Sequence, residues 1–370
     1  MSSANNLVNP AVSYSGEVDT LLIEKFDGQV KRAYKEKMNM KSYFEIKQVT
    51  GTNSVSNKYL GTVGVQALAP GADVKGQKAG FDKNQLVIDT TVIARNLVGV
   101  LADVQDDIMT KGKLAEEQVD ALTYLEDRML IQQVAYGAVQ NTKTKRTNPR
   151  VPGHGFSIDI KVKLATMEVP NAVVAAIEYA LEQQMEQNTP LEKFTIIMPW
   201  KYFNILRDAE RIVNANYNTS QGIAIKSGFV LKSYNVPVVP TNQMPKRSRD
   251  HVDVDGVVQD HHLLSNASNG NRYDVTNTGA DTIDSNIVAL IFGTEALLAG
   301  RSIDLTGKIW FNDQNKTWYI DSWMSEGAIP DRWEQSAIVR VVADGSASED
   351  AAVKARANRK AIPVNNTLLS

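Results

Sequence analysis

The chain has 370 residues, of which 43% are hydrophobic and 22% are charged, a composition typical of folded proteins and large enough for two or three units. Its 40 basic and 42 acidic residues give a formal net charge of -2, which excludes a field strong enough to attract nucleic acid or an anionic membrane. The absence of cysteine excludes disulfides, thiolate catalysis and cysteine-ligated metal centres. No apolar run reaches the roughly 18 residues of a membrane span, and the N-terminal residues lack a secretory signal pattern, so we expect a cytosolic protein.

The N-terminal region contains one amphipathic pattern after a polar start. Apolar side chains recur there at every fourth residue, at Val18, Leu22, Phe26, Val30 and Tyr34. This spacing places them on one face of a helix. Because no other helical pattern lies nearby, we expect the face to pack elsewhere in the fold or on another molecule.

A long excursion lies between two strand-like runs, SYFEIKQV at 42–49 and LVIDTTVI at 86–93. Residues 51–85 between them are rich in Gly, Ser, Asn and Lys and are far more numerous than a hairpin loop requires. The segment Val65 to Asp89 has few large apolar side chains, so we predict that it cannot hold one conformation by itself. Something outside the segment must hold it.

The clearest helical pattern covers residues 116–141, which contain no proline and form a helix of roughly 39 Å. Its predicted core side chains, spaced mainly by three and four residues, are Val119, Leu122, Leu125, Met129 and Val134. A helix this long predicts a rigid spine on which other elements pack.

The rest of the chain alternates helices and strands after a basic linker at 142–155, which indicates an α+β fold. We predict a helix from Pro170 to about Asn188, a strand at 194–198, a helix at 201–213 and strand character at 228–240. Residues 287–300 predict a buried strand followed by a short helix, and 302–324 predict two strands joined at 312–316. The last strand is expected at 336–342, with a poorly ordered tail after it.

Sequence motifs for catalysis are missing: there is no phosphate-binding glycine loop, no GxSxG and no HExxH. The remaining metal candidate is the cluster of His251, Asp253, Asp255, Asp260, His261 and His262. A calcium loop requires a carboxylate at its first position and a glutamate at its twelfth, and here both positions are histidine. We therefore prefer a solvated loop within a polar insertion at 244–284, with a weak metal site as the alternative.

Four tryptophans, Trp310, Trp318, Trp323 and Trp333, lie close together in the sequence. Cross-strand packing explains them best, with a carbohydrate or ligand platform as the alternative. The basic runs at 143–146 and 246–249 are interpreted as solvated loops because no aromatic residues alternate with them.

Short motifs occur in a consistent order from about residue 15 to 345. They are FDGQVKRAY at 26–34, Leu60 with Gly61, LAPG at 68–71, MPWKYFNIL at 198–206, SGFVLKSYNVPVV at 227–239 and IVALIFGTEALLAGRSIDL at 287–305. With the order of elements, they resemble the major capsid proteins of tailed bacteriophages, of the Hong Kong 97 type, and the podovirus branch in particular. The insertion at 244–284 and the tryptophan-rich segment at 308–333 depart from that pattern.

The resemblance implies an α+β Hong Kong 97-type fold with an N-terminal arm, an extended E-loop, a P domain with a long spine helix, and an A domain. The implied boundaries are 1–45 for the arm, 46–92 for the E-loop, 93–165 and 301–346 for the P domain, 166–300 for the A domain and 347–370 for a tail. Intersubunit contacts are implied for the five apolar arm residues and, in the E-loop, for Leu60, Gly61, Leu68, Ala69, Pro70, Gly71, Lys75, Lys78 and Lys83.

The implied function is self-assembly into hexamers and pentamers of an icosahedral head, a procapsid that then matures. The head would enclose double-stranded DNA without sequence-specific binding. The implied partners are a separate scaffolding protein, a portal protein and, as an option, a decoration or cement protein. No enzyme activity, cofactor, membrane or lysine–asparagine cross-link is expected, and the location is the virion capsid, assembled in the host bacterial cytoplasm. The alternatives are a portal or tail ring component, or a metal-dependent enzyme that uses the cluster at 251–262.

Overall fold

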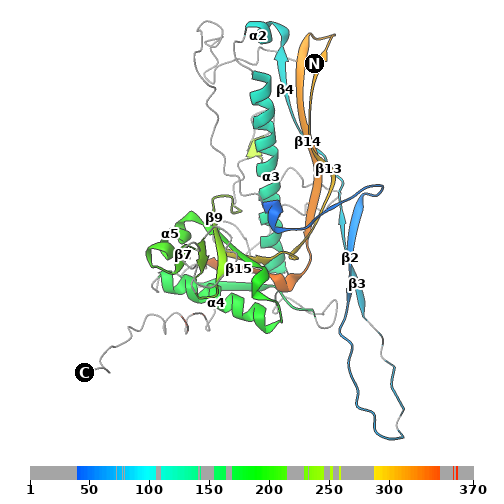
Figure 1. The fold of residues 1–370 in the computed structure, drawn as a ribbon, viewed down its shortest axis with the longest axis vertical. Helices are drawn as coiled ribbons and strands as arrows, with labels where there is room; N and C mark the ends of the chain where they lie inside the picture. Colours follow the sequence, from blue (N-terminus) through cyan, green and yellow to red (C-terminus); the bar gives the residue numbers. More distant parts are fainter. Residues whose placement is uncertain are drawn as a thin grey trace, which may run out of the picture.

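The computed structural model describes residues 40–71, 73–76, 78, 80–105, 110–140, 142, 154–163, 169–214, 229–231, 233–245, 251–252, 258–259, 287–341, 353 and 356. Figure 1 shows a long central helix flanked by a long sheet, a second α/β unit at its lower end, and a hairpin that projects away from both. The five predicted arm residues, Val18, Leu22, Phe26, Val30 and Tyr34, lie outside the described residues. No described helix is long and apolar enough to cross a membrane.

The described helices and strands follow one another in the order of the sequence predictions, with some differences given below. The helices are α2 (Val100–Gln105), α3 (Thr110–Gln140), α4 (Val169–Glu186) and α5 (Trp200–Asp208), with short 3-10 turns η1 (Met40–Tyr43), η2 (Leu191–Lys193) and η6 (Trp333–Gln335). The strands are β1 (Ile46–Gln48), β2 (Ser54–Leu60), β3 (Phe81–Val87), β4 (Val92–Gly99), β5 (Ile158–Val162), β6 (Phe194–Pro199), β7 (Ile212–Asn214), β8 (Phe229–Leu231), β9 (Val236–Thr241), β10 (His251–Val252), β11 (Val258–Gln259), β12 (Ile287–Gly293), β13 (Leu297–Asn312), β14 (Thr317–Pro330) and β15 (Ser336–Val341).

A seven-stranded mixed sheet forms the core of the α/β unit, in the order β5-β15-β12-β6-β9-β8-β7. All seven residues of β12 are buried, because both faces of this sheet are covered. Ile196, Val288 and Ile291 pack in the cluster that contains α4, whereas Ile197 and Leu290 pack in the cluster that contains α3. The continuous apolar runs of the sequence therefore come from strands between two helical layers.

The long sheet beside the spine helix has the order β1-β13-β14-β4, and β14 runs antiparallel to both of its neighbours. Helix α3 has 31 residues, so it is about 46 Å long and begins six residues before the predicted start at 116. Its C-terminal half is buried nearly all round, between the two sheets. The spine predicted from the sequence is present, and it joins the two units.

Of the five residues predicted to form the core face of the spine helix, three are buried and one is half-buried. The prediction for the fifth is wrong. Leu122, Met129 and Val134 are buried, and Leu125 is half-buried in the same cluster. Val119 is 38% exposed. Among the described residues, the N-terminal part of the helix packs against the long sheet, and Gln118 takes the sheet-facing position there, donating to the Ile320 carbonyl at 2.9 Å. Hydrophobic spacing alone could not show that a glutamine faces the sheet.

The short helix predicted after β12 is also wrong, because residues 297–300 begin strand β13. The chain turns through 294–296, where the Ala296 amide donates to the Gly293 carbonyl at 3.2 Å. Leu297 and Ala299 then pack in the cluster around α3, and Leu298 packs in a separate cluster under the E-loop. Both faces of this strand are covered, so its sequence is apolar without alternation, which resembles a helix.

The turn predicted at 312–316 between the two long strands is confirmed. Strands β13 and β14 pair from Leu297 with Pro330 to Asn312 with Thr317, and a tight turn connects them. Trp310 stacks on Tyr319 with ring centroids 4.4 Å apart, and Phe311 lies 5.0 Å from Trp318. Cross-strand packing therefore accounts for Trp310 and Trp318, as the sequence indicated.

The tail differs from the prediction at the two positions that the structure describes. Val353 is fully buried in the core of the α/β unit, and Arg356 forms an ion pair with Glu182 of α4. These two residues are thus ordered against the body rather than part of a loose tail.

The domain boundaries given above stay predictions. The seven-stranded sheet takes β5 and β15 from segments that the sequence placed in the P domain. The long sheet takes the start of β13, residues 297–300, from the segment that the sequence placed in the A domain. Each sheet is thus assembled from segments that are distant in sequence.

Candidate assembly surfaces

The E-loop projects from the body as a two-stranded hairpin, with its tip far from the rest of the chain (Figure 1). Strands β2 and β3 pair from Ser54 with Val87 to Leu60 with Phe81, and the Gly61 amide donates to the Gly80 carbonyl at 2.8 Å. Within the tip, the Gln66 side chain bridges to the Lys75 backbone, with its amide 2.6 Å from the Lys75 carbonyl. The excursion is therefore more regular near the body than the sequence predicted.

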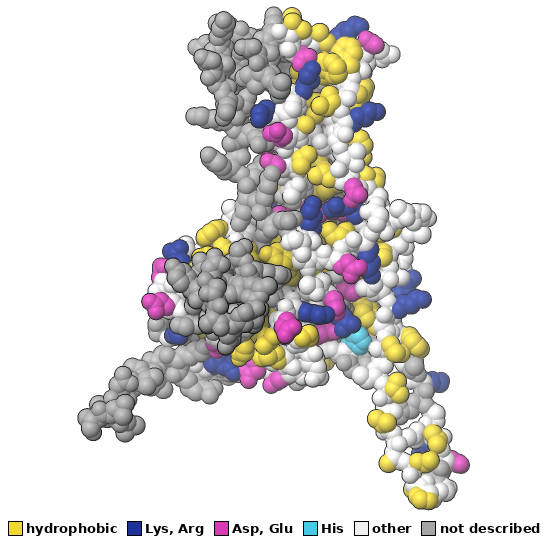
Figure 2. Space-filling view, viewed as in Figure 1, with side chains coloured by type: hydrophobic (Ala, Val, Ile, Leu, Met, Phe, Trp, Pro, Cys, Tyr) yellow, Lys and Arg dark blue, Asp and Glu magenta, His cyan; other side chains and the backbone are white. Residues whose placement is uncertain are grey.

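The tip displays large apolar side chains to solvent, and Figure 2 shows them gathered at the end of the projecting hairpin. The exposed set is Leu60 (56%), Val63 (70%), Val65 (101%), Leu68 (59%), Val74 (69%) and Phe81 (74%). Exposed apolar surface of this kind is typical of sites that bind proteins, membranes or ligands. In the sequence these residues form no apolar run, because they are scattered among glycines and lysines.

Most of the predicted E-loop contact residues lie on this exposed hairpin. Gly61 is buried, whereas the rest of the predicted set is exposed: Leu60, Leu68, Ala69, Pro70, Gly71, Lys75, Lys78 and Lys83. Gly71 has a φ of +84°, a backbone conformation that favours glycine in the LAPG turn. Their roles as intersubunit contacts stay a prediction.

A second exposed apolar region lies at the far end of the long sheet, where Figure 2 shows further hydrophobic side chains near the upper end of the molecule. Leu101 and Val104 of α2 are 70% and 78% exposed, and Ile309 of β13 is about half exposed. Ile93 of β4, also about half exposed, pairs with Trp323 nearer the middle of the sheet. Val119 of α3 adds to this set. The two exposed apolar regions thus lie at opposite ends of the molecule.

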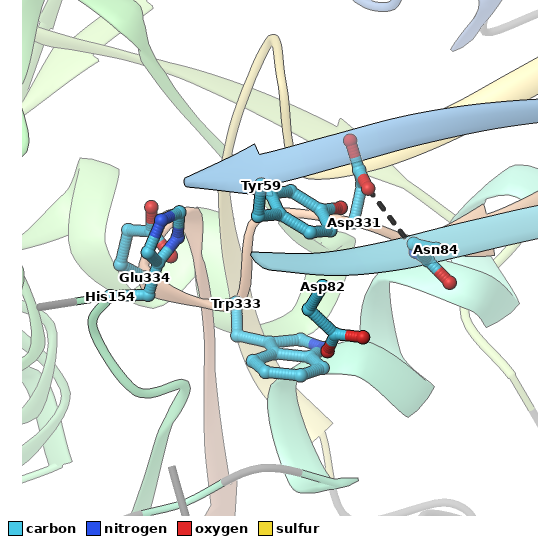
Figure 3. Close-up of a pocket in the computed structure, with 7 residues that line it drawn as sticks. All are labelled: Tyr59, Asp82, Asn84, His154, Asp331, Trp333 and Glu334. Carbon is cyan, nitrogen blue, oxygen red and sulfur yellow. Dashed lines mark hydrogen bonds between the residues drawn. The ribbon is translucent and has the colours of Figure 1, made fainter. Parts of the chain in front are cut away.

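The root of the E-loop is fixed to the body by polar side chains and by a small apolar cluster. Leu86 and Ile88 pack there with Val49, Leu298 and Ile329. Figure 3 shows the adjoining pocket, in which His154 and Trp333 of the body face Tyr59 and Asp82 of the hairpin. The ring nitrogen Nε2 of His154 lies 3.1 Å from the Leu60 carbonyl, and its ring meets Tyr59 edge-on at 5.5 Å.

A buried group of charges ties the spine helix to the long sheet. Nη2 of Arg301 on β13 lies 2.5 Å from Glu126 of α3 and 2.8 Å from Glu326 of β14. All three side chains are at most 12% exposed. Burial, and to a smaller extent the nearby Glu126, raise the pKa of Glu326 to about 7, against the opposing effect of Arg301. Burial also raises the pKa of Glu126.

This group makes stability depend on pH in a defined direction. Since the native pKa of Glu326 is about 7, above its ordinary value of 4.5, the folded protein binds more protons than the unfolded chain between these values. The stabilisation is complete below pH 4.5 and is lost as the pH rises through 7, on the order of 3 kcal/mol in total. We expect the urea midpoint to fall between pH 4.8 and 7.4, and Glu326→Gln to flatten this slope. An equal slope in both proteins would contradict the assignment.

Of the predicted metal cluster, the structure describes only the backbone of His251, which pairs with Gln259 in the two-stranded β10–β11 ribbon. The other members, Asp253, Asp255, Asp260, His261 and His262, lie outside the described residues. Within the described ranges, no three His, Asp or Glu side chains gather in a way that could hold a metal ion.

Comparison with known proteins gives a fold match without a sequence match. No family model matches the chain, and no curated protein matches its sequence. Solved structures do match. The capsid of cyanophage P-SCSP1u aligns over 87% of this chain and 93% of its own at a TM-score of 0.65 and 15% identity. The mature capsid of bacteriophage PhiM1 aligns over 86% and 92% at 0.63 and 15%, and the capsid of Ralstonia phage GP4 over 89% and 98% at 0.57 and 13%.

These alignments cover more than four fifths of each chain. The podovirus branch suggested by the short motifs stays a prediction. The chain has the Hong Kong 97-type fold of bacteriophage capsid proteins.

Proposed function

We propose that this chain is a major capsid protein, which assembles with copies of itself into the hexamers and pentamers of an icosahedral phage head. The observation that carries the proposal is the exposed apolar tip of the E-loop, on a fold that phage capsid proteins share. A side chain such as Val65, fully exposed in one subunit, gains about 1.5–3 kcal/mol when a neighbour buries it. Repetition of such contacts around a closed symmetry gives a stable shell.

The near-neutral charge of the chain fits a shell that encloses double-stranded DNA without binding its sequence. Assembly in the host bacterial cytoplasm, and the help of a separate scaffolding protein, a portal protein and a decoration or cement protein, belong to the same proposal. A portal or tail ring is the competing structural role, and it predicts rings of one symmetry instead of closed shells.

The test is sedimentation velocity with negative-stain electron microscopy of the purified protein over a range of concentrations. Closed shells, or separate rings of six and of five subunits, would support the proposal. Rings of a single other symmetry would favour a portal or tail component. A monomer at every concentration, with and without a scaffolding protein, would contradict both.

A matched pair of E-loop variants connects assembly to the exposed tip. In the polar variant, serine replaces Val63, Val65, Leu68 and Val74, and we expect shells and rings to be lost because four apolar contacts disappear from every subunit. In the conservative variant, isoleucine replaces the three valines and methionine replaces Leu68, and we expect assembly to persist. Far-UV circular dichroism should be the same for both, since these side chains are exposed in the subunit. Assembly of the polar variant at the wild-type concentration would contradict a contact role for the tip.

A further inference from the structure

One face of the E-loop hairpin carries three cross-strand pairs of side chains, which contact the body of the subunit. The register pairs Val55 with Leu86, Asn57 with Asn84, and Tyr59 with Asp82. Because alternate residues of a strand share a face, all six side chains lie on the same side of the hairpin. Val55 and Leu86 pack in the apolar cluster at the root, and Tyr59 and Asp82 line the pocket with His154 and Trp333.

The middle pair of this series meets a single carboxylate. Nδ2 of Asn57 donates to Oδ2 of Asp331 at 2.6 Å. Nδ2 of Asn84 donates to Oδ1 of the same residue at 3.1 Å, the contact marked in Figure 3. Nδ2 of Asn84 also donates to the Pro330 carbonyl at 2.9 Å. Thus each strand of the hairpin contributes one carboxamide, and each oxygen of the carboxylate accepts one of them.

The carboxylate itself is held firmly by the body. Asp331 directly follows β14 and is 8% exposed, and its backbone amide donates to the Ala296 carbonyl at 2.8 Å. Nζ of Lys47 on β1 donates to Oδ1 of Asn57 at 2.8 Å, which orients that carboxamide toward Asp331. Hydrogen bonds to a charged acceptor are about twice as strong as neutral ones, and more so where water is excluded.

We propose that Asp331 is the positioning residue of the E-loop: together with Asn57 and Asn84 it forms a clamp that fixes the direction of the hairpin before any neighbour binds. A two-stranded hairpin alone is only marginally stable in water, so its direction has to be set at its root. A hairpin whose direction is fixed in advance loses less conformational entropy when it binds a neighbouring subunit, and each contact is stronger for that reason. The benefit of this fixed direction for assembly rests on the proposed function, whereas the clamp itself is a feature of the single subunit.

The test measures the direction of the hairpin in subunits held below the concentration at which they assemble. Since the chain has no cysteine, two introduced cysteines can be labelled selectively. Lys58→Cys places a spin label on the face of β2 opposite the clamp, and Glu192→Cys places one on the body; both positions are exposed. Double electron–electron resonance then gives the distribution of distances between hairpin and body.

We expect one narrow distribution for the wild-type background and a distribution about twofold wider for Asp331→Ala, because both amide contacts are lost. Asp331→Asn offers only one acceptor oxygen and should give an intermediate width. Asn57→Ala with Asn84→Ala removes the same contacts from the other side and should match Asp331→Ala. Combining all three changes should widen the distribution no further, since residues of one network are not additive.

Asp313→Ala is the matched control, because Asp313 is an exposed aspartate whose ion pair with Lys316 lies in the turn at the far end of the long strands. Its distribution should equal that of the background. The clamp is overturned if the wild-type distribution is already as wide as those of the variants, if both clamp variants keep the narrow width, or if Asp313→Ala widens it equally. None of these outcomes depends on whether the protein forms shells, so failure of the clamp and failure of the capsid proposal are distinguishable.

Discussion

Replacement of Arg301 by methionine is expected to lower the free energy of unfolding by about 3–5 kcal/mol. The change leaves the carboxyl groups of Glu126 and Glu326 buried against each other without their shared guanidinium. Part of this penalty is relieved by protonation, so the loss should be smaller at pH 5 than at pH 7.5. Urea denaturation followed by far-UV circular dichroism at the two pH values measures both effects.

Two further proteins make this measurement specific. Arg207→Met removes an exposed arginine that pairs with Asp208 on the surface, and it should change stability by no more than about 0.5 kcal/mol. The triple variant Arg301→Met, Glu126→Gln and Glu326→Gln should recover much of the loss, because the buried charges are then absent. An Arg301→Met protein as stable as the wild type at pH 7.5 would show that the charge group contributes nothing.

The second large effect is expected for Phe292→Ala, with a loss of about 3–5 kcal/mol. Phe292 of β12 is 1% exposed and faces the spine helix. Its ring stacks on Phe44 at 5.2 Å and meets Tyr43 edge-on at 5.9 Å, so it attaches the segment after η1 to the central sheet. Truncation would leave a cavity among three elements and loosen that segment. The midpoint of urea denaturation and near-UV circular dichroism of the tyrosines measure the two consequences.

Phe81→Ala is the control for this change, because the same side chain is removed from the E-loop, where it is 74% exposed. In the unassembled subunit it should alter stability by no more than about 0.5 kcal/mol. Equal losses in the two variants would mean that Phe292 does not hold the segment after η1 to the sheet.

Much of the fold could be predicted from local patterns in the sequence. The spine helix has regular apolar spacing over a length that strands do not reach, and the buried strand at 194–198 is a short apolar run that a proline ends. The order of short motifs also led to the fold that the structural comparisons show. The errors occurred where the environment changes along an element. Val119 of α3 is 38% exposed among the described residues, and residues 297–300 form a strand with both faces covered.

The polar sites could not be predicted in this way. The buried charge group consists of Arg301, Glu126 and Glu326, which are ordinary charged residues on regular elements. Glu126 is 175 residues from Arg301 in the sequence, and only the packing of α3 on the long sheet brings the two together. Asp331 likewise follows a strand without any distinctive motif, and its partners lie 274 and 247 residues away. For these sites the sequence shows which polar side chains are present, but it does not show which of them lie together in the fold.

Strand β14 joins the far end of the long sheet, at Thr317, to the residue beside the E-loop clamp, at Pro330. From Thr317 to Met324 it is hydrogen-bonded to β13 on one side and to β4 on the other, in antiparallel registers. A force along β14 therefore acts in shear on the backbone hydrogen bonds to both β13 and β4. Many of these hydrogen bonds must then break together rather than one after another. The subunit should therefore resist tension applied between the two ends of β14, at Thr317 and Pro330.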